Sequence, residues 1–379
     1  MPSRTLQRKR NRGQGPAAGE GERKLQAPAQ GRVDERAKRA VLRERVRPID
    51  FDRVSSVADL VGAMRGASIQ ARNLGLCAEV LDNLYADRGR PTVLLGLAGP
   101  LIAAGLRKVI RDLVVGGYVD VIVSTGAILY QDIYQARGFG HYVGDPQADD
   151  SRLRELLIDR IYDVYVDEEK FMETDGWLGR LADELPPGNY SSRAYLEFVG
   201  RHLDDPQSIV ATAARRGVPM FAPAINDSSI GIGLTDHYYR AKRAGRARIA
   251  IDSIRDNYEL TQIVVRSRKT AAIYIAGGVP KNYINDSVVM AYIFGAEKGH
   301  SYALQLTADN PHWGGLSGST LKEAVSWGKI RSKATTAMCF VEPSVSLPLL
   351  AGYALQRKLA RGRRPLRFGW EGDELTSLG

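Results

Sequence analysis

Short apolar runs alternate along this chain with longer segments that repeat apolar residues at helical spacing. The runs "TVLLGLAG" (92–99) and "VDVIVST" (119–125) have the length and the unbroken hydrophobicity of buried strands. Segments 100–117 and 126–138 follow them and have the spacing of helices. Strands without polar alternation are typical of a parallel sheet that is covered on both faces. The pattern therefore predicts a β–α–β unit at the start of a larger sheet.

The same alternation continues to the end of the chain. Further strands are expected at 218–224, 270–278, 301–307 and 336–344, and further helices at 56–64, 67–86, 191–205, 208–217, 248–267, 284–299 and 321–330. At least six strands separated by helices predict a Rossmann-like, doubly wound, mostly parallel α/β sheet with helices on both faces. We expect one α/β domain at 49–360 and a C-terminal tail at 361–379.

The charge of the chain is concentrated in an N-terminal arm. The 379 residues carry a net charge of +10, yet residues 1–48 alone hold 14 Lys and Arg against 5 Asp and Glu. This arm is rich in Gly, Pro and Gln and poor in apolar residues, so we expect it to be disordered, with a short charged helix from about Val33. It is either a contact for nucleic acid or another polyanion, or a solubilising tail. We find no interleaving of aromatic and basic residues elsewhere, so no nucleic-acid partner is expected except through the arm.

Composition also bears on location. No apolar run approaches the roughly 18–20 residues that span a bilayer, and no apolar core follows the basic N-terminus, so neither a membrane anchor nor a secretory signal is expected. Cys77 and Cys339 form neither a disulfide framework nor a metal-ligand spacing. We expect a cytoplasmic protein without a metal site.

Ligands of open α/β sheets bind at the carboxyl ends of the strands. The segments that follow the predicted strands are 96–105, 124–132, 226–233, 276–287, 307–320 and 342–344, and most contain glycine. Glycine lets backbone N–H groups approach phosphates closely. None of these loops is a strict G-x-G-x-x-G fingerprint, but several on one edge of a sheet predict a dinucleotide pocket.

The stretch "EAVSWGKI" places Glu323, Trp327 and Lys329 within seven residues. Most lysines are solvated surface charges. The alternative is that Lys329 is a nucleophilic amine whose pKa is lowered by a dry, aromatic surrounding.

Taken in this order, the loops resemble the deoxyhypusine synthase family over roughly residues 55–355. The most specific match is "EAVSWGKI", supported by "VDVIVST", "NDSSIG", "GGVPKNYI", "SGSTLKEAVSWGKI" and "SVSLPLL". The resemblance implies a homotetrameric, NAD-dependent transferase of alkyl (aminobutyl) groups that acts on a polyamine such as spermidine or putrescine. The residues that it implies near NAD are Ser124, Thr125, Gly126, Asp227, Gly277, Gly278, Thr307, Ala308 and Glu342.

The resemblance also implies a role for the lysine. NAD takes hydride from a polyamine carbon to give an imine, and neutral Lys329 attacks it and holds the four-carbon fragment as a Schiff base. An acceptor amine then displaces the lysine, and the retained cofactor reduces the new imine. Trp327 supplies an apolar face and a cation–π surface. Glu323 pairs with an ammonium end of the substrate.

Several positions depart from the family pattern. Asn282 stands where the family has histidine, and Ile232 and Leu316 stand where it has acidic residues. Tyr130 and Gln131 replace an acidic pair, while Glu342 replaces aspartate and keeps its charge. The residues expected to contact substrate in this altered site are Asn282, Asp236, His237, Asp309 and His312.

Three functions are therefore open. The first is aminobutyl transfer to a small amine, for which putrescine as donor and acceptor, giving homospermidine, is the simplest case. The second is deoxyhypusine synthesis on a lysine of a translation factor, which requires a protein acceptor. The third is an NAD-binding regulatory protein that has lost catalysis, because a fold alone does not establish an activity.

Overall fold

The computed structural model describes residues 34–379, and the chain divides into two compact units, Met1–Arg45 and Val46–Gly379. In the first unit, helix α1 (Glu35–Val41) begins at Asp34, whose carboxylate accepts hydrogen bonds from the N–H groups of Arg36 and Ala37. The short charged helix expected from about Val33 is thus confirmed. The predicted disorder of the arm falls mainly on residues 1–33, outside the described part of the chain.

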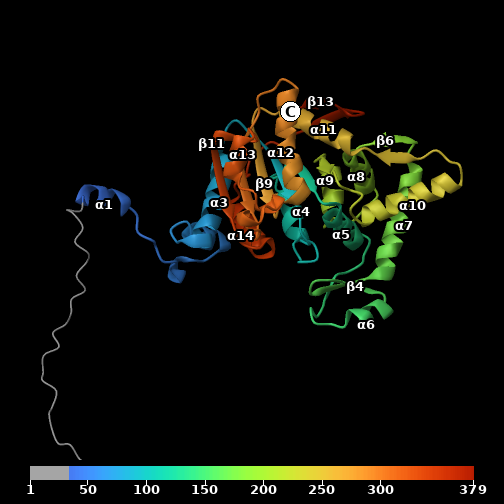
Figure 1. Ribbon diagram of the computed structural model, residues 1–379, viewed down its shortest axis with the longest axis horizontal. Coiled ribbons are helices and arrows are strands. Elements are labelled where there is room, and N and C mark those ends of the chain that lie inside the picture. Colours follow the sequence, from blue (N-terminus) through green and yellow to red (C-terminus); the bar gives the residue numbers. More distant parts are fainter. Residues whose placement is uncertain (1–33) are drawn as a thin grey trace, which may run out of the picture. The chain divides into compact units, whose positions relative to one another are not determined.

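The second unit is built on a six-stranded sheet in which every neighbouring pair is parallel (Figure 1). The strands are β1 (Thr92–Leu97), β2 (Val121–Ser124), β7 (Met220–Phe221), β9 (Thr270–Ile275), β10 (His300–Leu306) and β11 (Ile330–Cys339). Their spatial order is β11-β10-β9-β1-β2-β7. The chain thus builds outward from β1 in one direction and then outward from β9 in the other, which is the order of doubly wound dinucleotide-binding sheets. All six strands expected from the sequence are present, and the predicted fold class is confirmed.

Successive residues of each strand enter different cores. Leu95 of β1 packs in one apolar cluster, whereas Leu94 and Tyr274 pack in the other. The helices on the Leu95 side are α2 (Val57–Met64), α3 (Ile69–Ala86), α4 (Arg107–Val115), α5 (Gly126–Ala136), α9 (Ile209–Arg216) and α14 (Pro343–Arg357). The helices on the Leu94 side are α11 (Ser253–Arg266), α12 (Gly278–Ile293) and α13 (Leu321–Ser326). Both faces are covered, so unbroken apolar strands are stable here.

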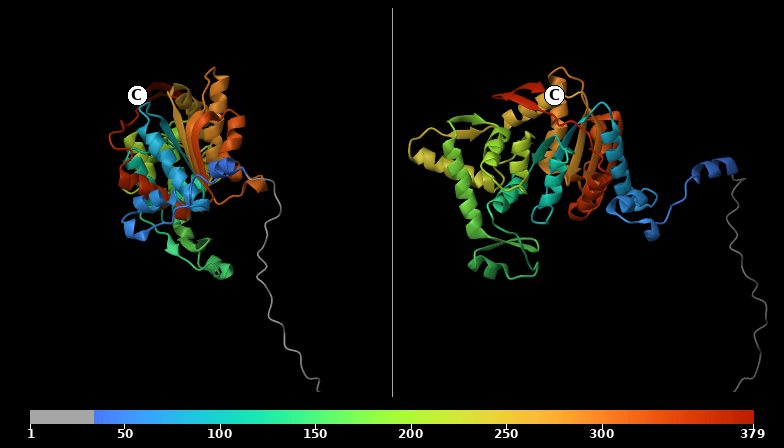
Figure 2. Two further views of the ribbon diagram at one scale, coloured as in Figure 1. Left: turned by 90° about the vertical axis from the view of Figure 1, so that its left-hand side faces the viewer. Right: turned by 180° about the vertical axis from the view of Figure 1, so that it is seen from behind.

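Several elements have no counterpart in the sequence predictions. The long helix α7 (Glu168–Glu184) packs on α10 (Ser229–Arg243). An antiparallel sheet of β3 (Tyr142–Val143), β4 (Ile158–Ile161) and β5 (Val164–Asp167), with α6 (Asp150–Glu155), lies beyond one end of α7 (Figure 2). The strand pair β6 (Gly188–Tyr190) and β8 (Ile249–Ile251) and three 3₁₀ turns, Phe51–Arg53, Pro311–Trp313 and Leu316–Gly318, were not expected either. By contrast, α8 (Ser192–Arg201) corresponds to the helix expected at 191–205.

Several boundaries differ from the predictions. The helix expected at 284–299 runs instead from Gly278 to Ile293, because it begins directly after the glycine that follows β9. The helix expected at 100–117 begins only at Arg107, because the chain first makes turns around Gly105, whose φ is +82°. Strand β8 occupies the start of the helix expected at 248–267. The helix expected at 321–330 ends at Ser326, and β11 begins at Ile330, six residues before the expected strand.

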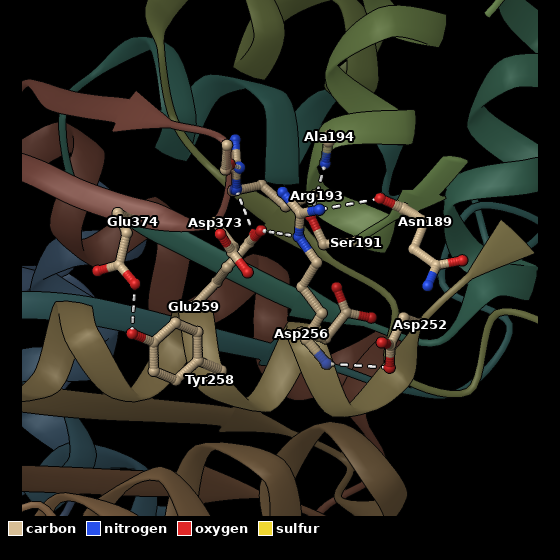
Figure 3. Close-up of polar contacts among 12 residues, drawn as sticks. Asn189, Ser191, Arg193, Ala194, Asp252, Asp256, Tyr258, Glu259, Asp373 and Glu374 are labelled. Carbon is tan, nitrogen blue, oxygen red and sulfur yellow. Dashed lines mark hydrogen bonds and ion pairs between the residues drawn. The ribbon is translucent and has the colours of Figure 1, made fainter. Parts of the chain in front are cut away.

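Residues 361–379 are not a separate tail. They form the hairpin β12 (Phe368–Glu371) and β13 (Glu374–Leu378), which lies within the second unit and fully buries Leu375. Side chains of α8 and α11 hold this hairpin (Figure 3): Tyr258 donates to Glu374 at 2.6 Å, and Arg193 donates to the carbonyl of Gly372 at 3.2 Å. The guanidinium of Arg193 also bonds Glu259 at 2.6 Å and lies 4.0 Å from the ring of Trp370.

No helix of residues 34–379 is long and apolar enough to cross a membrane.

Candidate active site

The carboxyl edge of the sheet collects most of the residues expected to bind the cofactor. Ser124 ends β2, Gly277 and Gly278 follow β9, and Thr307 follows β10. The N–H of Thr307 donates to the carbonyl of Cys339 at 3.0 Å, so the loops after β10 and β11 are adjacent. The other expected residues on this edge are Thr125, Gly126, Asp227, Ala308 and Glu342, which lie in loops or helix starts after β2, β7, β10 and β11.

Helices α5 and α10 begin at this edge without a side-chain cap, since neither Thr125 nor Ser228 bonds the first turn. In α12 the first N–H, that of Gly278, already donates to the Ser317 hydroxyl, and Pro280 has no N–H. By contrast, the Glu342 carboxylate caps α14 by accepting the N–H of Ser344 at 2.8 Å. Uncapped helix N-termini present free N–H groups and a partial positive charge, which suits the pyrophosphate of a dinucleotide.

Glycine is required where these loops meet. A Cβ on Gly277 would lie 2.6 Å from Cα of Ser317, and a Cβ on Gly126 would overlap the Ser228 hydroxyl. The N–H of Gly278, whose φ is +59°, donates to the Ser317 hydroxyl at 3.0 Å. Gly277 therefore allows the loop after β10 to pack on the start of α12, and Gly126 allows Ser228 to pack on the start of α5.

Lys281 is a buried lysine that the sequence analysis did not single out. Its amine donates to Gln305 Oε1 at 2.9 Å and to the carbonyl and hydroxyl of Ser319 at 2.5 and 3.0 Å. Burial lowers the pKa of Lys281 to about 8, although the charges of Glu323 and Asp309 act in the opposite direction. Lys281 thus ties the first turn of α12 to the loop that carries Ser317. Its signal in the sequence was its position three residues after the glycine pair 277–278.

Lys329 lies at the other end of α13, in the turn before β11. Its amine lies 3.2 Å from Asp286 Oδ1 on α12 and 5.3 Å from the centre of the Trp327 ring. The second oxygen of Asp286 accepts the side-chain amide of Asn282 at 2.8 Å. The structure therefore joins three predicted residues, Lys329, Trp327 and Asn282, through Asp286, which the sequence analysis missed. The spacing of Asn282 and Asp286, four residues apart in a helix, was the available signal.

The apolar surrounding expected to exclude water from the Lys329 amine is incomplete within one chain. The Lys329 side chain is 15% exposed, but Trp327 is 67% exposed. Glu323 is also exposed, in the first turn of α13. Further exposed apolar side chains on the neighbouring helix and loop are Val279, Tyr292, Ile293, Trp313 and Leu316. A cavity of about 590 Å³ opens beside Trp327 and is also lined by Val288 and Tyr292.

Lys329 does not itself lie at the carboxyl edge. The N–H of His300, at the start of β10, donates to the Lys329 carbonyl at 3.0 Å, so the Lys329 backbone lies at the amino end of that strand. α12 runs from the carboxyl edge down the face of the sheet, and Asp286 stands two turns below its start. The amine therefore faces the α12–α13 surface, below the glycine loops.

Asp236 and His237 do not join this cluster. His237 is buried and bonds Asp183 of α7 at 2.9 Å, and Asp236 pairs with Arg240 at 2.7 Å. Their helix α10 follows β7, whereas Lys329 precedes β11, and these strands form opposite ends of the sheet. Five strand spacings of about 4.8 Å separate the ends, so one chain does not bring these side chains to its own Lys329.

The other expected substrate residues lie in the loop after β10. Asp309 accepts the N–H of Asn310 at 2.9 Å, and His312 is exposed in a 3₁₀ turn. Among the altered positions, Ile232 and Leu316 are exposed, whereas Tyr130 and Gln131 are buried. Tyr130 donates to the carbonyl of Phe171 at 2.9 Å, so its side chain is part of the core packing. Residues 34–379 contain no group of three His, Cys, Asp or Glu placed to hold a metal.

Comparisons with known proteins agree with this geometry. The family model for deoxyhypusine synthase matches residues 59–354. A protein named probable deoxyhypusine synthase 2 from Methanosarcina mazei is 42% identical over 334 residues, covering 86% of this chain and 94% of that protein. A deoxyhypusine synthase-like protein from Chlorobaculum parvum is 42% identical over 338 residues, covering 87% of this chain and 95% of its own length.

Among solved structures, a proposed deoxyhypusine synthase from Entamoeba histolytica has a TM-score of 0.55 at 17% identity, covering 82% of this chain and 97% of that one. This likeness supports the fold. The chain belongs to the deoxyhypusine synthase family. Enzymes of this family transfer aminobutyl groups from polyamines with NAD as cofactor.

Proposed function

We propose that this protein transfers a four-carbon aminobutyl group from a polyamine to a small amine acceptor, with Lys329 as the covalent carrier. The observation that carries the proposal is the Lys329–Asp286 pair at 3.2 Å beside the Trp327 ring. A lysine that is only a solvated surface charge does not require both a carboxylate on a neighbouring helix and an aromatic ring beside its amine, whereas Lys329 has both. An amine that must be presented to an imine carbon needs this kind of orientation.

Each side chain has a role in this proposal. Asp286 orients the Lys329 amine and accepts a proton from it, because a lysine must be neutral to attack. Trp327 stacks on the carbon chain and the ammonium group of the substrate. Glu323 and Asp309 provide carboxylates that pair with a free ammonium end. Asn282 holds the second oxygen of Asp286 and thereby fixes the rotamer of that carboxylate.

The residues of the carboxyl edge fit NAD. The uncapped starts of α5 and α10 suit its phosphates, and Gly278, where a Cβ would meet nothing closer than 4.0 Å, leaves space for close approach. We propose Ser124, Thr125, Asp227, Thr307, Ala308 and Glu342 as its further contacts. When bound, NAD supplies the acceptance and the return of hydride.

The altered positions support a small substrate. Ile232 and Leu316 expose apolar side chains at two positions where the family has carboxylates. Asn282 replaces a histidine, and its amide is already engaged with Asp286. Each missing carboxylate removes a partner for an ammonium group, so a diamine with two charges suits this site better than a longer polyamine. Putrescine as donor and acceptor, with homospermidine as product, is the simplest case.

The relatives favour a second candidate. Two proteins that cover most of this chain are named as deoxyhypusine synthases or deoxyhypusine synthase-like proteins. Deoxyhypusine synthesis uses the same Lys329 chemistry but requires a lysine of a translation factor as acceptor. The exposed position of Trp327 leaves room for such an acceptor.

One experiment separates these candidates. The purified protein is incubated with NAD and labelled putrescine or spermidine, with and without a cognate translation factor, and the labelled product is identified. Labelled homospermidine supports the proposal. Label found only on the added protein favours deoxyhypusine synthesis. Saturable NAD binding without any product favours a catalytically inactive regulatory protein.

We further propose that a second copy of the chain completes the site within a homotetramer. The exposed Trp327, Tyr292, Ile293 and Trp313 form apolar surface around Lys329 that water disfavours. Light scattering on the eluted protein measures the assembly, and a monomer that is fully active would contradict this part of the proposal.

A reducing cytoplasm suits the two free, buried cysteines.

A further inference from the structure

A second large cavity lies away from the candidate active site. Its volume is about 750 Å³, within the range of ligand pockets. Gly117 and Asp120, just before β2, line it together with Val218, just before β7, and Arg90, just before β1. The cavity therefore lies at the amino edge of the sheet. The glycine loops lie at the opposite edge, about 20 Å away by the length of a six-residue strand.

The lining of this cavity includes the Asp120 carboxylate, which two arginines bind. Asp120, which is 4% exposed, accepts two hydrogen bonds of 2.8 Å from Arg90 and a further 2.8 Å bond from the N–H of Val93. Arg363 bonds the same carboxylate at 2.5 and 3.2 Å and the carbonyl of Gly117 at 2.7 Å. Two guanidinium groups thus share one carboxylate, and of these three side chains Arg90 and Asp120 line the cavity.

The backbone at Arg90 is unusual as well. Its φ is +50°, in the left-handed region that residues other than glycine rarely adopt. Strain of this kind persists where the surroundings hold it in place, and it is concentrated at functional sites. Here the carbonyl of Arg364 and the Asp120 carboxylate together fix the Arg90 guanidinium.

Three more arginines line the cavity without a carboxylate partner. Arg216 ends α9. Arg364 and Arg367 belong to residues 358–367, the strap that leads from α14 to the hairpin. All three are exposed, and none takes part in an ion pair within 4.0 Å among residues 34–379. The lining thus holds four arginines, Arg90 and these three, against two carboxylates, those of Asp120 and of Gly379 at the chain end. Such a concentration is costly unless an anion neutralises it.

From this geometry we infer a binding site for a small polyphosphate anion, such as the phosphate chain of a nucleotide, at the amino edge of the sheet. Arginine is suited to this chemistry because its planar fork bonds two phosphate oxygens at once. Several guanidinium groups around a cavity of limited volume fit a ligand with two or more phosphates better than a single carboxylate. The carboxyl-edge loops proposed for NAD take no part in this site.

The site also has a structural consequence. The strap carrying Arg364 and Arg367 continues directly into β12 and β13, which Arg193, Tyr258 and neighbouring side chains bind to α8 and α11 (Figure 3). An anion bridging Arg216 to Arg364 would tie this strap to α9. Ligand binding should therefore stabilise the C-terminal hairpin as well as the sheet edge.

Titration of the full chain with inorganic tripolyphosphate by calorimetry, at constant ionic strength, tests the inference. The wild-type protein should bind it saturably and unfold at a higher temperature in its presence. The double variant Arg216→Glu/Arg364→Glu should bind at least about tenfold more weakly, because it loses two charge-assisted contacts. Arg361→Glu is the matched control, since it reverses an exposed charge on the same strap outside the cavity lining. The control should bind within about twofold of the wild type.

Three results would overturn the inference. One is the absence of saturable tripolyphosphate binding to the wild type. Another is equal weakening by the control and the double variant, which would indicate a diffuse basic surface. The third is a single-stranded RNA that binds at least about a hundredfold more tightly and loses this affinity in the double variant, which would assign the site to nucleic acid. Single Arg216→Ala and Arg367→Ala variants provide the comparison if the double variant fails to fold.

Discussion

The carboxylate of Asp286 lies 3.2 Å from the amine of Lys329, and this pair joins helix α12 to the turn before β11. The α12 helix starts among the glycines of the carboxyl edge, so one element connects the proposed cofactor loops with the proposed covalent carrier. The pair thereby links the two halves of the proposed reaction.

Replacing Asp286 by asparagine should lower kcat by about tenfold to a hundredfold with little change in NAD affinity. The amide keeps the shape of the side chain but no longer orients the amine or accepts its proton, and small misplacements of a reacting group have effects of this size. Steady-state kinetics and calorimetric NAD titration measure both quantities. Glu79→Gln, an exposed change on α3, serves as the control. An unchanged kcat in Asp286→Asn would show that the pair does not act in the reaction.

Gly277→Ala should weaken NAD binding by at least about tenfold. The added methyl group would meet Cα of Ser317 at 2.6 Å, and backbone atoms cannot move away as a flexible side chain does. The loop after β10 would have to shift from the start of α12. Gly62→Ala is the matched control, because a Cβ there meets nothing within 4 Å. Equal NAD affinity in both variants, measured by calorimetry, would contradict the proposed position of the cofactor.

Lys281→Met should destabilise the protein by about 1–3 kcal/mol, because the oxygens of Gln305 and Ser319 lose their buried donor. The loss should also depend on pH. The pKa of Lys281 is about 8 in the folded chain and ordinarily 10.5, so between these values the unfolded chain holds a proton that the folded chain has released. The unfolding free energy of the wild type should therefore rise with pH, relative to the variant, from about pH 8 to 10.5.

Denaturant unfolding of both proteins across this pH range provides the measurement. A difference between them that is independent of pH would mean that Lys281 keeps its ordinary pKa. A difference in unfolding free energy between wild type and variant that shrinks as the pH rises would contradict the lowered pKa of Lys281.

Most of the fold could be predicted from the sequence because burial on both faces leaves a direct mark. The central strands β1, β2 and β9 appear as mainly apolar runs such as residues 92–97 and are buried throughout. An exposed strand leaves no such mark, which is why β3, with exposed Tyr142 and Val143, was not expected. The hairpin at 368–378 was taken for a tail because its buried content is mainly Leu375 and side chains that pack from other helices.

The site could be predicted only where a local motif marks it. Lys329 and Trp327 are two residues apart in sequence, whereas Asp286 is brought to Lys329 by the packing of α12 on the sheet. His237 looked available for a substrate, but the tertiary structure commits it to Asp183. Aromatic and basic residues do interleave at 237–248, contrary to the expectation for the part of the chain beyond the arm, and the Arg248 guanidinium lies 4.0 Å from the centre of the Tyr238 ring.

Lys329→Arg should reduce aminobutyl transfer by several orders of magnitude while leaving NAD affinity nearly unchanged. Arginine keeps the positive charge opposite Asp286, but it is not deprotonated at working pH and forms no Schiff base. Lys333→Arg, an exposed position on β11, is the control and should retain full activity. An arginine variant with only a small loss of activity would reduce Lys329 to an electrostatic role.

The most direct measurement of the central proposal is borohydride trapping followed by mass spectrometry of the intact protein and its peptides. Wild-type protein incubated with NAD and putrescine, then reduced, should gain the mass of one four-carbon aminobutyl group on the peptide that contains Lys329. The Lys329→Arg protein should gain none, and neither should wild-type protein without NAD. A wild-type enzyme that turns over but is never trapped, or an adduct that forms on another lysine such as Lys281, would contradict the assignment of Lys329 as the carrier.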